Sequence, residues 1–332
     1  MFSIIVPLYN KAPYIIKAVE SICQQTCQNF EVVIVNDGST DKSLEIIESY
    51  LKSLKTKDIE LFNKFTILNQ ENSGVSVARN NAIKIAKYDY LAFLDADDWW
   101  ETTYLEEMFK LIQEFPNAGL WSCKYYVVKN KTKRFARIGL NSNFKKGIIN
   151  YFKVYAETLE MPVWTGATII KKSVFFEKNG FKPNLALGED FDLWIRVALN
   201  YSVAFLNSPL SNYNFDIDLY NRAVDTYKIY LPHKHYIFNL DYLNQEETIN
   251  EDLKFLLDKL RVYTLFPYYF KNLYTEEFQR EILKVNFNNL PFYCKLQFKL
   301  PILLINLWIN FKVFNSKYII NKLMLLKAKI IK

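Results

Sequence analysis

The chain has 332 residues, half of them apolar, with a net charge of +7 and four cysteines. This length suits one large α/β domain with an appendage, or two modest domains. Nine lysines and no acid follow Glu281, so the positive charge belongs to the end of the chain and gives no reason to expect a nucleic-acid partner. The cysteines lack the paired spacing of a metal site, and we expect ordinary thiols.

Strands and helices alternate through the first half of the sequence. Apolar runs predict strands at residues 2–8, 31–35, 65–68 and 90–94. The segments between them predict helices at residues 12–24, from the capping residues 39–41 to about 54, and at residues 75–86. This rhythm is typical of an α/β fold in which a mainly parallel sheet carries helices on both faces. The polar segments that follow the strands would then lie at one edge of the sheet.

The second half has a less regular pattern. A helix is predicted at residues 101–115 and a strand at residues 119–128, while residues 129–155 have the weak periodicity of a loop. A strand ends at residue 170, and a helix follows at residues 188–199. Beyond residue 207 the pattern predicts helices at residues 219–243, 249–265, 275–286 and from 292 onward. We therefore expect one domain over residues 1–215 and a helical region over residues 216–332.

The apolar run at residues 91–94 is followed at once by three carboxylates, Asp95, Asp97 and Asp98. Because side chains alternate along a strand, Asp95 and Asp97 would project to the same side. Two carboxylates there suit a hard divalent cation such as Mn²⁺ or Mg²⁺, and ligands of open α/β sheets bind at the carboxyl ends of strands. The alternative is a turn in which Asp98 caps the following helix. No glycine-rich phosphate loop of either common type is present, so a phosphate ligand would need the cation.

The end of the chain has a distinct composition. Residues 300–309 are apolar but too short to span a bilayer. With the lysines around them they fit a segment lying in a membrane surface, and a helical hairpin packed on the body is the alternative. The first residues begin a strand without a charged leader, so we expect the chain to stay in the cytoplasm.

Five motifs occur in order along the chain: IIVPLYN at residues 4–10, VIVNDGSTD at 33–41, NSGVSVARN at 72–80, DADD at 95–98 and GED at 188–190. As a set, they resemble family 2 glycosyltransferases of the GT-A fold, over about residues 1–210. The resemblance implies a Rossmann-like nucleotide-diphospho-sugar transferase domain and inverting sugar transfer.

The resemblance also implies roles at the nucleotide. Pro7 and Tyr9 would border the base, and Asp37 would accept a hydrogen bond from it, unless Asp37 only forms the turn before Gly38. Arg79 would lie near the nucleotide and the acidic cluster, and a structural ion pair with one of those acids is compatible with that role.

For the carboxylates, the resemblance implies that Asp95 holds the ribose and that Asp97 binds the metal bridging the diphosphate. Asp98 would either support the metal site from behind Asp97, without direct contact to the metal, or cap the helix. Asp190 would be the base that takes the proton of the acceptor hydroxyl, with an acid favoured by the helix dipole as the alternative. Gly188 would permit the tight entry into that helix.

Near that base, Trp164, Thr165 and Gly166 occupy the place of the family's acceptor and donor-sugar contacts, and Glu189 is a further candidate. A core tryptophan is the alternative for Trp164. Glu189 and Asp192 would also cap the helix or neutralise positive charge nearby.

The processive members' Gln-x-x-Arg-Trp motif and multiple membrane spans are missing, which favours transfer of a single sugar. We predict a metal-dependent enzyme that moves a sugar from a UDP-linked donor to a surface glycan or lipid-linked oligosaccharide at the inner face of a membrane, which the end of the chain would contact. Two alternatives remain, a sugar-phosphate nucleotidyltransferase and a non-catalytic scaffold that binds nucleotide sugars.

Overall fold

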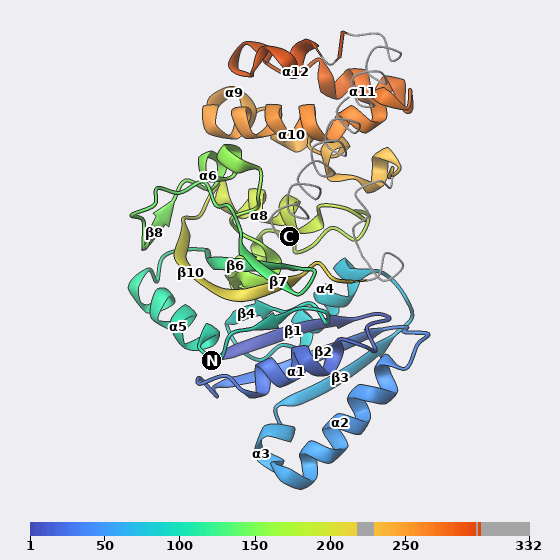
Figure 1. Ribbon diagram of the computed structural model, residues 1–332, viewed down its shortest axis with the longest axis vertical. Helices are drawn as coiled ribbons and strands as arrows, with labels where there is room; N and C mark the ends of the chain where they lie inside the picture. Colours follow the sequence, from blue (N-terminus) through green and yellow to red (C-terminus); the bar gives the residue numbers. More distant parts are fainter. Residues whose placement is uncertain (218–228, 297, 300–332) are drawn as a thin grey trace, which may run out of the picture. The chain divides into compact units, whose positions relative to one another are not determined.

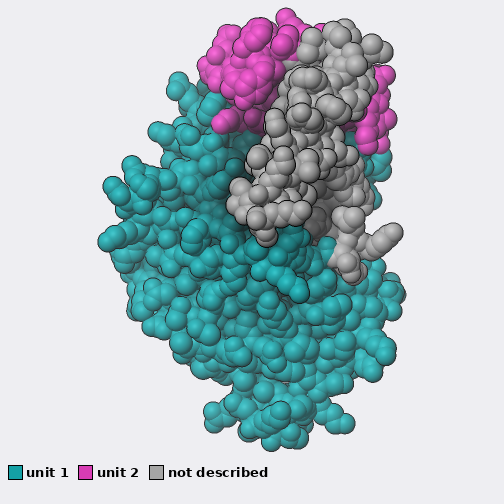
Figure 2. All heavy atoms as spheres, viewed as in Figure 1, with its two compact units in different colours: residues 1–256 teal, residues 257–332 magenta. Residues whose placement is uncertain are grey.

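The computed structural model describes residues 1–217, 229–296 and 298–299 (Figure 1). The chain packs as two compact units, residues 1–256 and 257–332, which Figure 2 colours separately. This division lies further along the chain than residue 215. The predicted domain boundary at residue 215 rests on a change in the sequence pattern, and it stays a prediction.

Unit 1 is built on one ten-stranded sheet. Its strands are β1 (Phe2–Leu8), β2 (Phe30–Asp37), β3 (Phe65–Gln70), β4 (Tyr90–Phe93), β5 (Trp99–Trp100), β6 (Leu120–Lys129), β7 (Thr132–Phe135), β8 (Lys146–Ile149), β9 (Thr168–Lys171) and β10 (Val203–Asn214). The order across the sheet is β3-β2-β1-β4-β9-β6-β10-β5, with β7 beside β6 and β8 beside β10.

The first four strands are parallel and in register. Leu8 lies opposite Asn36 of β2, and Ile5 lies opposite Phe93 of β4. The loops that follow β1, β2 and β4 therefore meet at one edge of the sheet, as the alternation predicts. Parallel pairing returns between β6 and β10, whereas β9 runs antiparallel to both β4 and β6. The α/β class is confirmed, with the parallel order interrupted by β9.

Helices cover both faces of this sheet, as predicted (Figure 1). Phe2, Ile4 and Val6 of β1 belong to one core cluster with residues of the helices α1, α2 and α5. The alternating side chains point to the opposite face, where Phe93 packs against Trp194 with ring centroids 6.0 Å apart. The helices of unit 1 are α1 (Ile15–Cys23), α2 (Ser43–Lys57), α3 (Ile59–Phe62), α4 (Val75–Ile85), α5 (Tyr104–Glu114), α6 (Tyr151–Thr158), α7 (Lys172–Glu177), α8 (Glu189–Ala198) and α9 (Glu246–Ile249).

Three predictions for the second half are wrong in part. The segment beyond residue 207 continues as β10 to Asn214 instead of turning to helix. Residues 229–243 form short 3₁₀ turns rather than a helix, and residues 218–228 of that prediction lie outside the described residues. Residues 129–155 hold β7, β8 and the start of α6 rather than a loop. All four side chains of β7 are exposed, so the strand has no apolar alternation to reveal it.

Unit 2 is helical where the structure describes it. The helix α10 (Glu251–Phe270) runs into this unit, followed by α11 (Thr275–Ile282) and α12 (Phe292–Leu296). The helices predicted at residues 249–265 and 275–286 are confirmed in most of their length. The one predicted from residue 292 onward is seen only to Leu296, and most of its remainder lies outside the described residues. Arg261 of α10 and Glu281 of α11 form a fully buried ion pair at 3.3 Å. None of the helices traced in either unit is both long and apolar enough to cross a bilayer. The predicted membrane-surface segment at residues 300–309 lies outside the described residues.

Candidate active site

The loops after β1 and β2 are tied together at the edge of the sheet. Asn10 has a left-handed backbone (φ +51°), and its N–H donates a hydrogen bond to Ser39 Oγ at 3.2 Å. The N–H of Thr40 donates in return to Asn10 Oδ1 at 2.8 Å. Pro7, the residue before the last one of β1, is half-buried, and Tyr9, just after the strand, is 44% exposed. These loops hold an open aromatic side chain at the edge where a ligand is expected.

Asp37, at the end of β2, is buried and fixes the segment that leads into α4. Its carboxylate accepts hydrogen bonds from three groups: Gln70 Nε2 at 2.7 Å, Ser73 N–H at 2.8 Å and Gly74 N–H at 2.9 Å. The turn before Gly38 is closed instead by Asn36, whose Oδ1 accepts the N–H of Ser39. The turn-forming alternative for Asp37 is therefore wrong, and its bond to a nucleotide base stays a prediction.

The acidic turn after β4 is not a helix cap. Asp98 is buried, and its Oδ1 accepts the N–H of Asn214 in β10 at 2.7 Å. The next helix, α5, begins only at Tyr104 with Thr103 at the N-cap, because Trp99 and Trp100 first pair with β10. Burial and the neighbouring carboxylates raise the pKa of Asp98 well above its ordinary value.

Two cations neutralise the other acids of this turn. Lys11 Nζ lies 2.6 Å from Asp97 Oδ2, and Arg79 Nη2 lies 2.7 Å from Asp95 Oδ1. Burial raises the pKa of Asp97 and the nearby Asp95 adds to the rise, while Lys11 opposes it. The ion pair of Arg79 confirms the compatible role that the sequence suggested. Lys11 was missed, although its position directly after β1 could have indicated it.

Arg79 also joins this turn to the first residue of α8. Its Nη1 lies 3.0 Å from Glu189 Oε1, and the guanidinium side chain is only 4% exposed. Burial lowers the pKa of Arg79, but Asp95 and Glu189 outweigh it and the pKa is raised overall. Burial and the adjacent Asp190 raise the pKa of Glu189 to about 7. Acids from two distant segments of the sequence are thus brought around one guanidinium.

Asp190 follows in the first turn of α8 and is half-buried. Its Oδ2 accepts a hydrogen bond from Thr165 Oγ1 at 3.0 Å, and its Oδ1 accepts the N–H of Phe191 at 2.7 Å. Burial raises the pKa of Asp190, Arg79 and these two hydrogen bonds oppose the rise, and the net shift is upward. A positioned carboxylate with a raised pKa has the properties of a general base.

The backbone before α8 requires glycine. Gly188 has φ +77°, and a Cβ at this position would lie 2.2 Å from Tyr236 Cδ1. The tight entry into the helix predicted at Gly188 is confirmed, and it places Glu189 and Asp190 side by side at the helix start.

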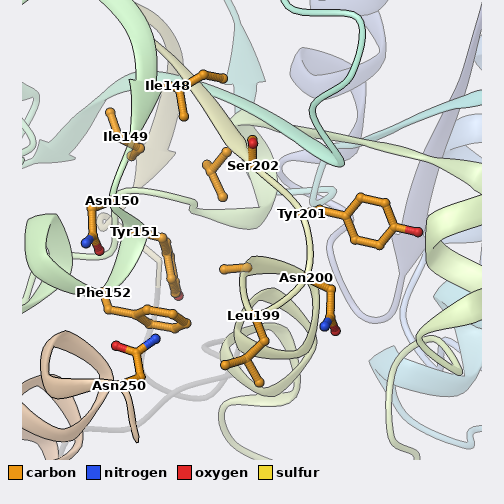
Figure 3. A pocket seen from close by; sticks show the side chains of 12 residues that line it. Ile148, Ile149, Asn150, Tyr151, Phe152, Leu199, Asn200, Tyr201, Ser202 and Asn250 are labelled. Atoms are coloured by element: carbon orange, nitrogen blue, oxygen red, sulfur yellow. The ribbon is translucent and has the colours of Figure 1, made fainter. Parts of the chain in front are cut away.

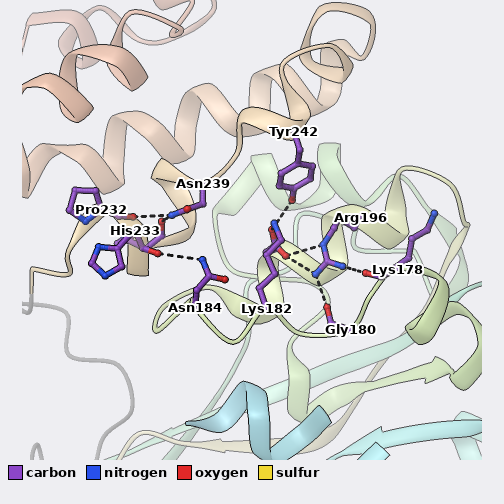
Figure 4. Close-up of polar contacts among 11 residues, drawn as sticks. Lys178, Gly180, Lys182, Asn184, Arg196, Pro232, His233, Asn239 and Tyr242 are labelled. Carbon is purple, nitrogen blue, oxygen red and sulfur yellow. Dashed lines mark hydrogen bonds and ion pairs between the residues drawn. The ribbon is translucent and has the colours of Figure 1, made fainter. Parts of the chain in front are cut away.

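Asp192, a buried residue of α8, holds this helix against its neighbours. Lys182, Arg196 and Tyr242 converge there (Figure 4), and all three contact the Asp192 carboxylate, at 2.7, 2.6 and 2.9 Å. Arg196 Nη2 also donates to the carbonyl of Gly180 at 2.8 Å. The prediction that Asp192 neutralises nearby positive charge is confirmed, and the network fixes the helix that carries Asp190.

Trp164 lies between two tyrosine rings near Asp190. Its ring centroid is 4.9 Å from that of Tyr125 and 5.0 Å from that of Tyr213. The indole is only partly buried against the core, whereas Thr165 and Gly166 are buried. A Cβ on Gly166 would lie 2.6 Å from Trp164 Cη2, so the ring folds back over a residue that has no side chain.

A cavity of about 500 Å³ lies elsewhere in unit 1 (Figure 3). It is bordered by the start of α6 and the loop between α8 and β10, and none of the predicted site residues lines it. Two of its polar side chains are engaged within the protein, because Asn150 donates to Asp252 and Asn200 accepts from Lys178. Among the residues that the structure describes, no three His, Cys, Asp or Glu side chains lie close enough together to hold a metal ion.

Comparison with known proteins identifies relatives of this chain. The model of the family described as "Glycosyl transferase family 2" matches residues 3–175. An uncharacterized glycosyltransferase of Rickettsia felis is 35% identical over 63% of this chain and 32% of its own length. Glycosyltransferase GlyA of Streptococcus pneumoniae is 33% identical over 64% of this chain and 30% of its own length. These matches span about a third of each of the two relatives.

A solved structure shares the fold. S. aureus TarS 1-349 in complex with UDP-GlcNAc superposes with a TM-score of 0.65 and 20% identity, covering 85% of this chain and 78% of that one. The match is to a family of sugar-transferring enzymes, which disfavours the nucleotidyltransferase alternative, and the scaffold alternative stays untested. The chain belongs to glycosyl transferase family 2, has the GT-A fold and is a glycosyltransferase.

Proposed function

We propose that this enzyme transfers one sugar, with inversion, from a UDP-linked donor to a hydroxyl of a surface glycan or lipid-linked oligosaccharide, and that it uses Mn²⁺ or Mg²⁺. The observation that carries the proposal is the bridge from Arg79 to Asp95 and Glu189. This bridge brings the acidic turn after β4 and the acid pair at the start of α8 together around the guanidinium of Arg79. The acceptor and a location at the inner face of a membrane rest on the apolar, lysine-rich end of the sequence.

The proposal of a divalent cation rests on the chemistry of the acidic turn rather than on a preformed cluster of ligands. Three carboxylates lie within four residues, and burial together with Asp95 raises the pKa of Asp97, a cost that a nearby cation would relieve. Carboxylate oxygens are ligands that Mn²⁺ and Mg²⁺ prefer. Asp97 would hold the cation, and the donor diphosphate would supply further oxygens. When bound, the cation would stabilise the departing diphosphate as a Lewis acid.

The nucleotide would lie along the edge formed by the loops after β1, β2 and β4. Tyr9, which is exposed there, and Pro7 would border the base, and Asp37 would accept a hydrogen bond from it. Asp95, with 30% of its side chain exposed, would hold the ribose. The hydrogen bond from Arg79 Nη2 to Asp95 Oδ1 fixes the orientation of this carboxylate.

Asp190 would take the proton from the acceptor hydroxyl as the oxygen attacks the anomeric carbon. Attack on the face opposite the diphosphate inverts that carbon. Thr165 and the N–H of Phe191 hold the carboxylate in place, and the open part of Trp164 would stack on the apolar face of a sugar. Glu189 would contribute a contact to the sugar or balance the charge of Arg79.

The test is donor hydrolysis and transfer with UDP-GlcNAc as the first donor, with EDTA and after Mn²⁺ is restored. Asp190→Asn should lower the rate by roughly 10²- to 10⁴-fold, and Asp97→Asn should remove the stimulation by Mn²⁺. Asp89→Asn changes an exposed acid just before β4 and should leave activity intact. Full activity in both the Asp97 and Asp190 variants would end the mechanistic proposal.

A further inference from the structure

The loop after β1 places a lysine on the carboxylate proposed to hold the cation. Lys11 Nζ lies 2.6 Å from Asp97 Oδ2, and each side chain is only 12% exposed. An ion pair with so little exposure is weakly screened by water, unlike a surface pair. The contact is therefore a defined feature of the sheet edge.

The backbone around Lys11 is fixed by four hydrogen bonds, three of which Lys11 itself makes. Its N–H donates to Ser43 Oγ at 2.7 Å, and the next N–H, of Ala12, donates to Asp41 Oδ2 at 3.1 Å. Its carbonyl accepts the N–H groups of Tyr14 and Ile15 at 2.9 and 3.0 Å, where α1 begins. Any change in the position of the ammonium group must therefore come from the four-carbon side chain.

The two cations of the site differ in the chemistry of their side chains. Arg79 is held by acids on two elements, Asp95 and Glu189. Lys11 carries a compact charge on a flexible stem, which is the form in which lysine binds phosphate in proteins. An ammonium group 2.6 Å from Asp97 Oδ2 would repel a divalent cation on the same carboxylate, so the pair must open before Asp97 can take that cation.

We propose that Lys11 neutralises Asp97 in the empty site and moves to the diphosphate when the donor binds, so that donor and cation occupy the site cooperatively. This inference rests on the proposed function. The donor brings negative charge to the edge where Lys11 lies, and the lysine exchanges one anionic partner for another. The exchange frees Asp97 at the moment when diphosphate oxygens complete the coordination of the cation.

Cooperative binding of this kind has a measurable size. Couplings between two ligands in proteins typically change each affinity by about 5- to 150-fold. Removal of the Lys11 charge should strengthen Mn²⁺ binding in the absence of nucleotide by about tenfold, within that range. The same substitution should reduce the increase in Mn²⁺ affinity that UDP produces, because no ion pair between Lys11 and Asp97 remains to be opened.

The experiment is an electron paramagnetic resonance titration of free Mn²⁺ with and without UDP, corrected for Mn²⁺ bound by UDP alone. The proteins are wild type, Lys11→Met, Lys11→Arg, Asp97→Asn and the control Lys42→Met, which removes an exposed lysine at the start of α2. Lys11→Met should bind Mn²⁺ more tightly than Lys42→Met without UDP and gain less from UDP. Lys11→Arg, which keeps the charge, should resemble wild type and also controls for folding.

The outcomes separate the inference from the proposed function. If wild type binds Mn²⁺ in a manner that depends on Asp97, and Lys11→Met matches Lys42→Met in both titrations, then the role of Lys11 is overturned and the metal site stands. If UDP produces no Asp97-dependent Mn²⁺ binding in wild type, the proposed metal site fails and the inference fails with it.

Discussion

The buried hydroxyl of Thr165 lowers the pKa of Asp190, the proposed base, and a single substitution can remove it. Thr165 is 2% exposed and donates to Asp190 Oδ2 at 3.0 Å. Thr165→Val keeps the volume of the side chain and removes the donor. A hydrogen bond to a charged group contributes about 1.5–3 kcal/mol, and one pKa unit corresponds to about 1.4 kcal/mol. Because the bond favours the ionised form, its loss should raise the pKa of Asp190 further.

The assay is the pH dependence of kcat/KM for transfer, whose acid limb reports the ionisation of the base in the free enzyme. Asp190 must be deprotonated to act, so the acid limb of wild type should lie above the range of an ordinary aspartate, and that of Thr165→Val should lie at still higher pH. Thr168→Val is the matched control, because Thr168 is also buried but donates to the carbonyl of Trp164. An unshifted limb in Thr165→Val, or an equal shift in Thr168→Val, would refute the reasoning.

Three further substitutions test other parts of the site. Gly166→Ala places a Cβ 2.6 Å from Trp164 Cη2 and should displace the indole, raising the acceptor KM by about fivefold if the lost stacking is worth about 1 kcal/mol; an unchanged acceptor KM would count against Trp164 as a sugar contact. Asp98→Asn keeps an oxygen to accept the N–H of Asn214 and should retain Mn²⁺ binding, whereas a large loss would make Asp98 a ligand. Asp192→Ala leaves Lys182 and Arg196 without their buried partner and should cost about 3–5 kcal/mol, measured as a lower urea midpoint; an unchanged midpoint would contradict the anchoring role.

The parallel half of the sheet and its ligand edge could be predicted because the signals are local. Each strand from β1 to β4 is an apolar run, and each is followed within a few residues by polar side chains such as Asn10, Asp37 and Asp95. The rule that carboxyl ends of parallel strands share an edge then assembles these residues without further information. Gly188 was recognisable for the same reason, since a glycine before two acids marks a strained helix entry.

The features that escaped prediction depend on partners distant in sequence. Asp98 was ambiguous because its partner is the N–H of Asn214, 116 residues away. The strand β10 is interrupted by register shifts on either side of Pro209, which destroy the period of two that reveals a strand. Lys11 could be placed at the sheet edge, but its pairing with Asp97 required knowing that β1 and β4 are neighbours.

The guanidinium of Arg79 also has a consequence for how the enzyme is made. Its two carboxylate partners are separated from it by 16 and 110 residues along the chain. At translation rates of roughly 5–20 residues per second, Glu189 leaves the peptidyl-transferase centre about 5–20 s after Arg79. A nascent chain that ends just after Asp95 holds half of this clamp, so the proposed catalytic centre is completed late in synthesis, after the loops that follow β1, β2 and β4.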